Sequence, residues 1–149
     1  ASLASGLPAL GEDSGLCVPA LDGAPGLYSA RYAGSPSNPA ANIAKLLEAM
    51  REVPAERRGA YFYCALVLFR HADDPMPLIC EGVWSGRILE QPRGRGGFGY
   101  DPVFYDPLVG LSAAEMELAA KHRVSHRGQA LFKLRRTLPA FFAGVPERH

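Results

Sequence analysis

The chain has 149 residues, of which 48% are hydrophobic and 21% are charged, and its formal net charge at pH 7 is +1. This composition is typical of a soluble globular protein, and the length suits one domain with a modest core. No apolar run is long enough to span a bilayer as a helix. The small net charge argues against nucleic-acid binding driven by bulk electrostatics.

Three cysteines, Cys17, Cys64 and Cys80, each lie in an apolar stretch that resembles a strand. No two of them form a Cys-x-x-Cys pair, which makes a metal site or a redox motif the less favoured interpretation. We expect reduced thiols in the core, as is usual in a cytosol-like compartment.

The first part of the chain predicts strands, a loop and a helix. Pro8–Leu21 alternates apolar segments with a polar break, which predicts two strands joined at an acidic corner. The stretch 21–34 is rich in turn-forming residues and predicts an ordered loop. Asn38 and Pro39 form a good helix start, and Pro54 should end the helix. Its apolar face is predicted to contain Ile43, Leu46, Leu47 and Met50.

Two further strands follow. Residues 60–69 are apolar at both alternating sets of positions, which predicts a central strand buried on both faces. Residues 77–89 predict a half-buried strand, and the polar stretch between the two indicates a hairpin connection.

A glycine-rich loop, PRGRGGFGYDP, runs from Pro92 to Pro102 and contains the spacing G-x-G-x-x-G. The dinucleotide fingerprint of this form requires a helix directly after the last glycine. Here Asp101 precedes a proline, which disfavours helical dihedrals, and Val103–Tyr105 then predicts a strand. The loop is therefore not a Rossmann fingerprint.

The C-terminal part predicts two helices. Ser112–Glu115 has the capping-box pattern, so a helix should run to about Lys121. Ser125 is a second cap, for a helix that Pro139 should stop. The order of elements predicts an α/β single domain over residues 1–149.

The acidic pair Glu12 and Asp13 is the first candidate for chemistry. Neighbours on a strand point to opposite faces, so both carboxylates serve one site only if the chain kinks, which Gly15 would allow. Such a pair suits a Mg²⁺ ligand beside a general base. Taken in isolation, a solvated turn is the better interpretation.

The glycine loop is the second candidate. Its glycines carry no side chains that would shield Phe98, so one face of the ring could stack on a base. Asp101, which precedes Pro102, can accept hydrogen bonds. A tight loop with Phe98 packed into the core explains the same residues equally well.

Lys121 and the run Ser125-His126-Arg127 form the third candidate. Free N–H groups at a helix start, together with Lys and Arg side chains, form a set of donors. Such a set would favour a 6-oxo purine, which has a carbonyl acceptor where adenine has an amino donor. His126 alone is more often a capping or packing residue.

Three segments, in this order and at these separations, closely resemble the inosine triphosphate pyrophosphatase family: EDSGLCVPALDGAPGLYSARYAG from Glu12, GGFGYDPVF from Gly96 and SHRGQAL from Ser125. Members of this family hydrolyse deaminated purine nucleoside triphosphates to the monophosphate and pyrophosphate. The resemblance covers about residues 6–138. It implies an elongated α/β fold with a mixed sheet and flanking helices, a Mg²⁺ cofactor, a homodimer and a cytoplasmic location.

The resemblance also implies roles for particular residues. Asp13 would be the base that activates the attacking water, and Glu12 and Asp13 would hold the Mg²⁺ ion. Phe98 would stack on the base, and Arg127 would contact the 6-oxo group. The other residues implied in substrate binding are Ser14, Gly99, Tyr100, Asp101, Lys121, Ser125 and His126.

The family begins with a strand, a phosphate-gripping Ser/Thr-x-Asn-x-x-Lys turn and a helix, which do not occur in these 149 residues. We therefore expect a domain that is incomplete at its N-terminus. The alternative function is a nucleotide-binding module that cannot hold the triphosphate for attack. A polynucleotide-binding protein is a third class, which would need a steep salt dependence of binding.

Overall fold

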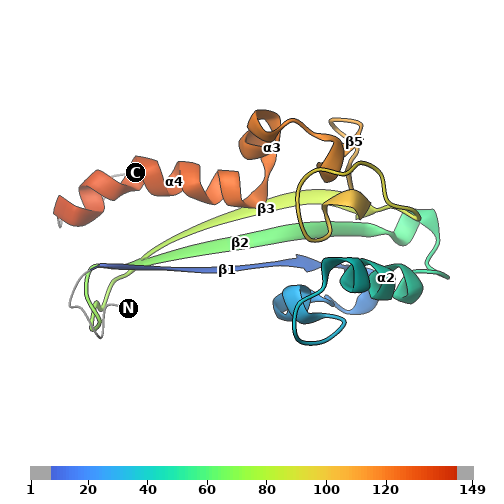
Figure 1. Cartoon of the computed structure of the whole chain (residues 1–149). Helices are drawn as coiled ribbons and strands as arrows, with labels where there is room; N and C mark the ends of the chain where they lie inside the picture. The colour runs from blue at the N-terminus through green and yellow to red at the C-terminus, as the bar shows by residue number, and fades with distance from the viewer. Residues whose placement is uncertain (1–7, 144–149) are drawn as a thin grey trace.

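The computed structural model describes residues 8–143, which form one five-stranded sheet with helices packed against it (Figure 1). The strand order is β1-β2-β3-β4-β5, and every neighbouring pair is antiparallel. The α/β class and the flanking helices are confirmed, although the described sheet is antiparallel rather than mixed. The strands are β1 Ala9–Cys17, β2 Gly59–Phe69, β3 Leu78–Ile88, β4 Phe104–Asp106 and β5 Leu111–Ser112.

The molecule is elongated along the first three strands (Figure 1). Helix α4 (His126–Ala143) lies along one face of β2 and β3, and α3 (Leu118–Val124) precedes it. Helix α2 (Pro39–Ala49) lies near the end of β1. Short 3-10 turns connect these elements, and two of them, η2 (Gly26–Arg31) and η4 (Asp101–Val103), border the candidate site. No helix within residues 8–143 has the length and apolar character needed to cross a membrane.

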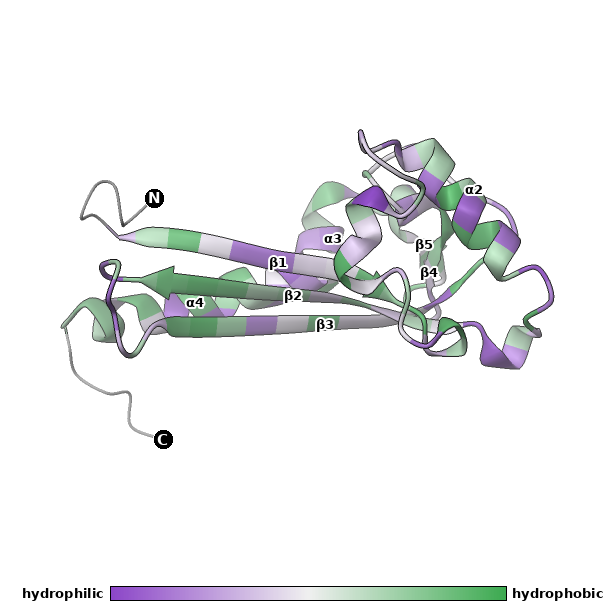
Figure 2. Ribbon diagram, turned by 90° about the horizontal axis from the view of Figure 1, so that it is seen from below, coloured by the Kyte–Doolittle hydropathy of each residue, from purple (hydrophilic) through white to green (hydrophobic). Residues whose placement is uncertain are grey.

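Strand β1 is continuous, which corrects the expectation of two strands with a kink between them. Every residue from Ala9 to Cys17 pairs with β2. The kink does not form because β2 offers an unbroken ladder along the whole of β1. Among residues 8–143, β1 is the outermost strand of the sheet, and the polar side chains in its middle are exposed. Figure 2 shows this contrast, with hydrophilic residues in the middle of β1 beside the hydrophobic β2.

The helix starts are confirmed in part. Asn38 caps α2 by accepting a hydrogen bond from the N–H of Ala41. The capping box at Ser112 is present, but it caps only one 3-10 turn before the backbone becomes extended at Met116. Met116 packs against the main core, which explains the break, and α3 begins separately. Helix α4 also runs past Pro139, where a stop was expected.

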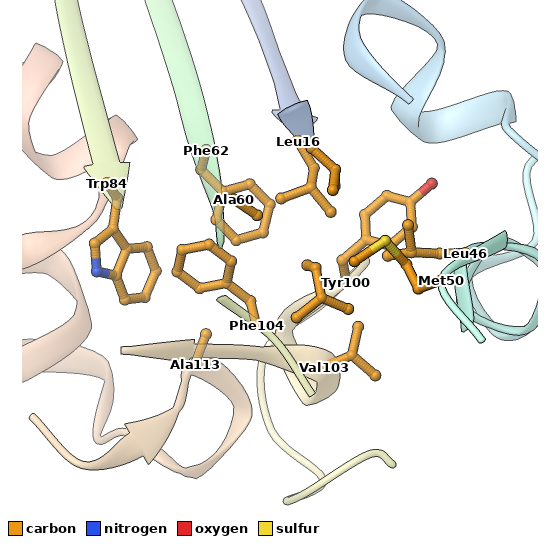
Figure 3. Packing of buried hydrophobic residues seen from close by; sticks show 12 residues of the cluster. Leu16, Leu46, Met50, Ala60, Phe62, Trp84, Tyr100, Val103, Phe104 and Ala113 are labelled. Atoms are coloured by element: carbon orange, nitrogen blue, oxygen red, sulfur yellow. The ribbon is translucent and has the colours of Figure 1, made fainter. Parts of the chain in front are cut away.

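The main hydrophobic core lies at the end of the sheet that carries β4 (Figure 3). Phe62, Trp84 and Phe104 pack with centroid separations of 4.4 Å for Phe62–Phe104 and 4.9 Å for Trp84–Phe104. A smaller cluster of Cys64, Leu66 and Ala130 lies between α4 and the sheet. Cys64 and Cys80 are buried and all three cysteines are free, as expected for reduced thiols.

Candidate active site

A cavity of about 300 Å³ opens beside the end of β1, between α2, the glycine loop and the start of α4. The segments that surround it are far apart in the sequence but meet at the main core. Its lining consists of Ser14, Gly15, Leu16, Ser29, Ala30, Ser37, Pro39, Asn42, Phe62, Phe98, Gly99, Tyr100, Asp101, Lys121, His126 and Arg127.

The glycine loop holds Phe98 out toward solvent. Gly97 and Gly99 have φ values of 71° and 58°, in the left-handed region that favours glycine. The carboxylate of Asp101 accepts a hydrogen bond of 3.0 Å from the N–H of Phe98, and a Cβ at Gly97 would overlap this carboxylate. The residue Phe98 is 62% exposed, so the alternative of a core-packed ring is wrong.

Two cations lie near the Phe98 ring. Lys121 is buried and forms an ion pair with Asp101, and its Nζ lies 4.5 Å from the ring centroid. The guanidinium carbon of Arg127 lies 5.6 Å from the same centroid. Since the charge of Lys121 is matched by Asp101, the ring, Lys121 and Asp101 form one ordered unit at the mouth of the cavity.

The start of α4 is held directly against the sheet and against α3. Ser125 caps the helix by accepting a hydrogen bond of 3.0 Å from the N–H of Gly128. A Cβ at Gly82 on β3 would overlap the carbonyl oxygen of His126. A Cβ at Gly128 would likewise overlap the carbonyl oxygen of His122. These glycines bring His126 and Arg127 to the cavity.

His126 is a buried, neutral side chain at the base of the cavity. Its ring stacks on Phe62 with a centroid separation of 4.7 Å. Burial, with smaller contributions from the charges of Arg127 and Lys121, lowers the pKa of His126 to about 4. Its Nδ1 is buried without a hydrogen-bond partner among the residues that the structure describes.

Glu12 and Arg127 form a bidentate ion pair at the edge of the sheet. Arg127 Nε donates to Glu12 Oε1 at 2.7 Å, and Arg127 Nη2 donates to Glu12 Oε2 at 3.0 Å. The hydrogen bond from Arg127 lowers the pKa of Glu12. The Cys64 thiol also donates to Glu12 Oε1 at 3.6 Å. The pKa of Cys64 is raised to about 11, mainly by burial and then by the charge of Glu12.

Asp13 points to the opposite face of the sheet from Glu12. Tyr63 lies on that opposite face, and its pKa is raised mainly by burial and then by the nearby carboxylates of Glu81 and Asp13. The expectation that a kink would bring Glu12 and Asp13 together is therefore wrong, because β1 keeps its pairing and its alternation. Within residues 8–143, no group of three or more His, Cys, Asp or Glu side chains could hold a metal ion.

The structure brings together most of the predicted substrate-binding residues. Ser125 caps α4 and does not line the cavity. Tyr100 is mostly core, since it is 5% exposed and its hydroxyl donates to the carbonyl oxygen of Ser29. The predicted residues that line the cavity are Ser14, Phe98, Gly99, Tyr100, Asp101, Lys121, His126 and Arg127.

The residues that form the opposite wall of the cavity were not predicted from the sequence. Ser29 is buried, and its hydroxyl accepts a hydrogen bond of 2.8 Å from the N–H of Leu16. Asn42 is also buried; its side chain accepts from the N–H of Ala33 and donates to the carbonyl oxygen of Ala30. A signal existed for Asn42, a polar residue in helical register with the apolar Leu46.

The cavity has an exposed aromatic ring beside two cations and a polar wall opposite them. A site of this kind suits a flat, anionic ligand, as in a nucleotide-binding protein. The sequence model of the Ham1 family matches residues 1–137. The chain belongs to the Ham1 family, which confirms the resemblance carried by its three motifs.

Known proteins agree with this assignment. The chain is 66% identical over 140 residues to the dITP/XTP pyrophosphatase of Xanthomonas axonopodis pv. citri, covering 94% of this chain and 70% of that protein. A solved HAM1 protein from Coxiella burnetii is 49% identical, with a TM-score of 0.87 over 91% of this chain and 68% of that one. The Ham1 protein of Staphylococcus aureus is 36% identical, with a TM-score of 0.86 over 94% of this chain and 71% of that one.

Proposed function

We propose that this protein hydrolyses deaminated purine nucleoside triphosphates, such as dITP, ITP and XTP, to the monophosphate and pyrophosphate. The observation that carries the proposal is the cavity that joins Phe98, the Lys121–Asp101 pair and Arg127. Phe98 offers a stacking surface, and Arg127 has donors for a carbonyl at the 6 position of the base. The 66% identity to a dITP/XTP pyrophosphatase supports the same activity.

Asp13 is proposed as the base that takes a proton from the attacking water. Its side chain is exposed, and it directly precedes Ser14 and Gly15, which line the cavity. Among residues 8–143, β1 is the outermost strand of the sheet, so a nucleotide with its base at Phe98 would extend its phosphates past β1 toward the face that carries Asp13. The water would attack the α-phosphorus, with pyrophosphate as the leaving group.

Mg²⁺ is proposed as the cofactor. Mg²⁺ is commonly held by one or two carboxylates together with substrate phosphates, and Asp13 is an exposed carboxylate of this kind. The ion would supply charge neutralisation on the phosphates as charge moves to the leaving group. Since residues 8–143 contain no group of three possible protein ligands, the substrate phosphates and water would supply the other ligands.

The activity is tested by pyrophosphate release from dITP and dATP in the presence of Mg²⁺. Wild-type protein is expected to release pyrophosphate from dITP and to prefer dITP over dATP. A folded protein that binds dITP without turning it over would instead support the alternative of a nucleotide-binding module. A folded protein that neither binds nor hydrolyses dITP would contradict both functions.

Replacing Asp13→Asn should lower the turnover of dITP by at least about 100-fold, because the amide cannot accept the proton. Nucleotide affinity should remain close to that of wild type, since the base pocket is unchanged. The matched control is Asp73→Asn, at an exposed carboxylate in the β2–β3 connection. Unchanged turnover in Asp13→Asn would exclude Asp13 as the base.

A homodimer in the cytoplasm is proposed for the assembly and location. Three aliphatic side chains in the β4–β5 hairpin support a self-contact, because Leu108 is 96% exposed and Val109 and Leu111 are also exposed. No charged residue occurs between Pro107 and Ser112, so two copies could meet there without like-charge repulsion.

A further inference from the structure

The ion pair between Glu12 and Arg127 joins two residues that lie 115 positions apart in the sequence. Both oxygens of the Glu12 carboxylate are occupied, one by Nε and the other by Nη2 of Arg127. The Oε1 atom also accepts from the Cys64 thiol. A bidentate pair of this kind fixes the plane of the guanidinium as well as its position.

The pair leaves Arg127 able to bind a ligand. A guanidinium carries five N–H donors, and Glu12 takes one from Nε and one from Nη2. Both donors on Nη1 and one on Nη2 remain. Since the guanidinium carbon lies 5.6 Å from the Phe98 centroid, these donors lie beside the surface on which a base would stack.

The same geometry argues against a metal ion at Glu12. A dication bound to this carboxylate would lie next to the positive guanidinium, and the two charges would repel each other. Glu12 and Asp13 also face opposite sides of a strand that keeps its pairing from Ala9 to Cys17. The two carboxylates cannot hold one ion unless β1 separates from β2.

We propose that Glu12 is a positioning residue for Arg127 and not a ligand of the metal ion. Its carboxylate holds the guanidinium in the orientation that meets the 6-oxo group of the purine, so Glu12 contributes to base selectivity. This inference rests on the proposed function, which supplies the 6-oxo purine as the ligand. An arginine held in advance loses less conformational freedom on binding than one that is free to rotate.

The test measures binding without metal. The affinities of dIMP and dAMP for wild type and Glu12→Gln are measured by calorimetry in EDTA. Glutamine keeps the size of the side chain but loses the charge and one acceptor. We expect the dIMP affinity to fall by about tenfold, with little change for dAMP. A metal ligand would instead leave the dIMP affinity in EDTA unchanged.

Kinetics provide a second measurement that separates the two roles. With Mg²⁺, Glu12→Gln should raise KM for dITP, while kcat and the Mg²⁺ concentration for half-maximal activity stay near wild type. An increased Mg²⁺ requirement together with an unchanged preference for dITP over dATP would overturn the proposal. The matched control is Glu48→Gln, which removes an exposed carboxylate paired with Arg51 and should change neither measurement.

A double-mutant cycle tests whether Glu12 acts through Arg127. The variant that combines Glu12→Gln with Arg127→Ala should bind dIMP as Arg127→Ala alone does, and additive losses would overturn the proposal. If Glu12→Gln does not fold, Glu12→Asp carries the same expectation, because it withdraws the carboxylate by one methylene. If wild type shows no preference for dIMP over dAMP, the proposed function fails as well. If wild type prefers dIMP and Glu12→Gln keeps the same preference, only the proposal for Glu12 fails.

Discussion

His126 connects the candidate site to the hydrophobic core. Its ring stacks on Phe62 at 4.7 Å and lies 6.4 Å from the ring of Trp84, measured between centroids. The charged groups around it are Arg127, Lys121 and Glu12, and the two cations disfavour a third positive charge. At neutral pH the imidazole is therefore uncharged and behaves as an aromatic packing residue at the base of the cavity.

The burial of neutral His126 predicts a loss of stability in mild acid. The pKa of His126 is about 4 in the folded protein, and an unperturbed histidine has a pKa of about 6.5. Between these values the unfolded chain takes up a proton that the folded protein does not. The contribution of neutral His126 to the free energy of unfolding is therefore complete above about pH 6.5 and decreases as the pH falls toward 4.

Because of His126, the free energy of unfolding, measured by urea denaturation, should be about 2 kcal/mol lower at about pH 5 than at about pH 7.5. In His126→Gln this pH-dependent contribution should disappear, and the variant should be less stable than wild type at neutral pH, where the stacking on Phe62 is lost. His71→Gln removes an exposed histidine and should keep the wild-type slope. The same pH dependence in His126→Gln and wild type would show that His126 does not cause it.

At the scale of elements, the position of α4 depends on close backbone approaches. Gly82 on β3 lies under the carbonyl oxygen of His126, and Gly128 lies against the carbonyl oxygen of His122. Any side chain at these positions would push the start of α4 away from the sheet or from α3. Since Arg127 lies in the first turn of α4, such a displacement would also move its guanidinium away from Glu12 and Phe98.

Replacing Gly82→Ala should lower the free energy of unfolding by about 1–3 kcal/mol, because the added methyl group overpacks the contact with α4. It should also weaken dIMP binding. Gly11→Ala is the matched control, since Gly11 is a strand glycine with no atom near its Cβ position. That control should be neutral or slightly stabilising. Equal effects of the two substitutions in urea denaturation would contradict this account of α4.

The elements that the sequence predicted correctly have local causes. The Asn38 cap and the start of α4 after Ser125 depend on side chains next to the helix ends. The break between Ser112 and α3 could not be predicted from the capping pattern, because the cause is the packing of Met116 against the distant core. The extent of β1 was missed for a similar reason, since its partner β2 stabilises the polar segment.

At the scale of the whole molecule, the site could be predicted only in part. The three matched motifs contributed most of the cavity lining, and their convergence beside Phe98 agrees with the family resemblance. The ion pair between Glu12 and Arg127 could not be predicted, because no local pattern relates residues that lie 115 positions apart. Ser29 was missed because it acts through backbone contacts inside a loop.

The exposed aliphatic hairpin predicts how two copies of the molecule would associate. Leu108 is 96% exposed at the β4–β5 turn, beside the short strand β5. If the proposed dimer forms there, Leu108→Lys should weaken it by at least about tenfold, because a charge would enter an apolar contact. Met76→Lys is the control, since Met76 is 72% exposed at the β2–β3 connection and should leave the dimer intact. Sedimentation velocity would show a shift to monomer only for Leu108→Lys, and an unchanged dimer in that variant would exclude the hairpin as the interface.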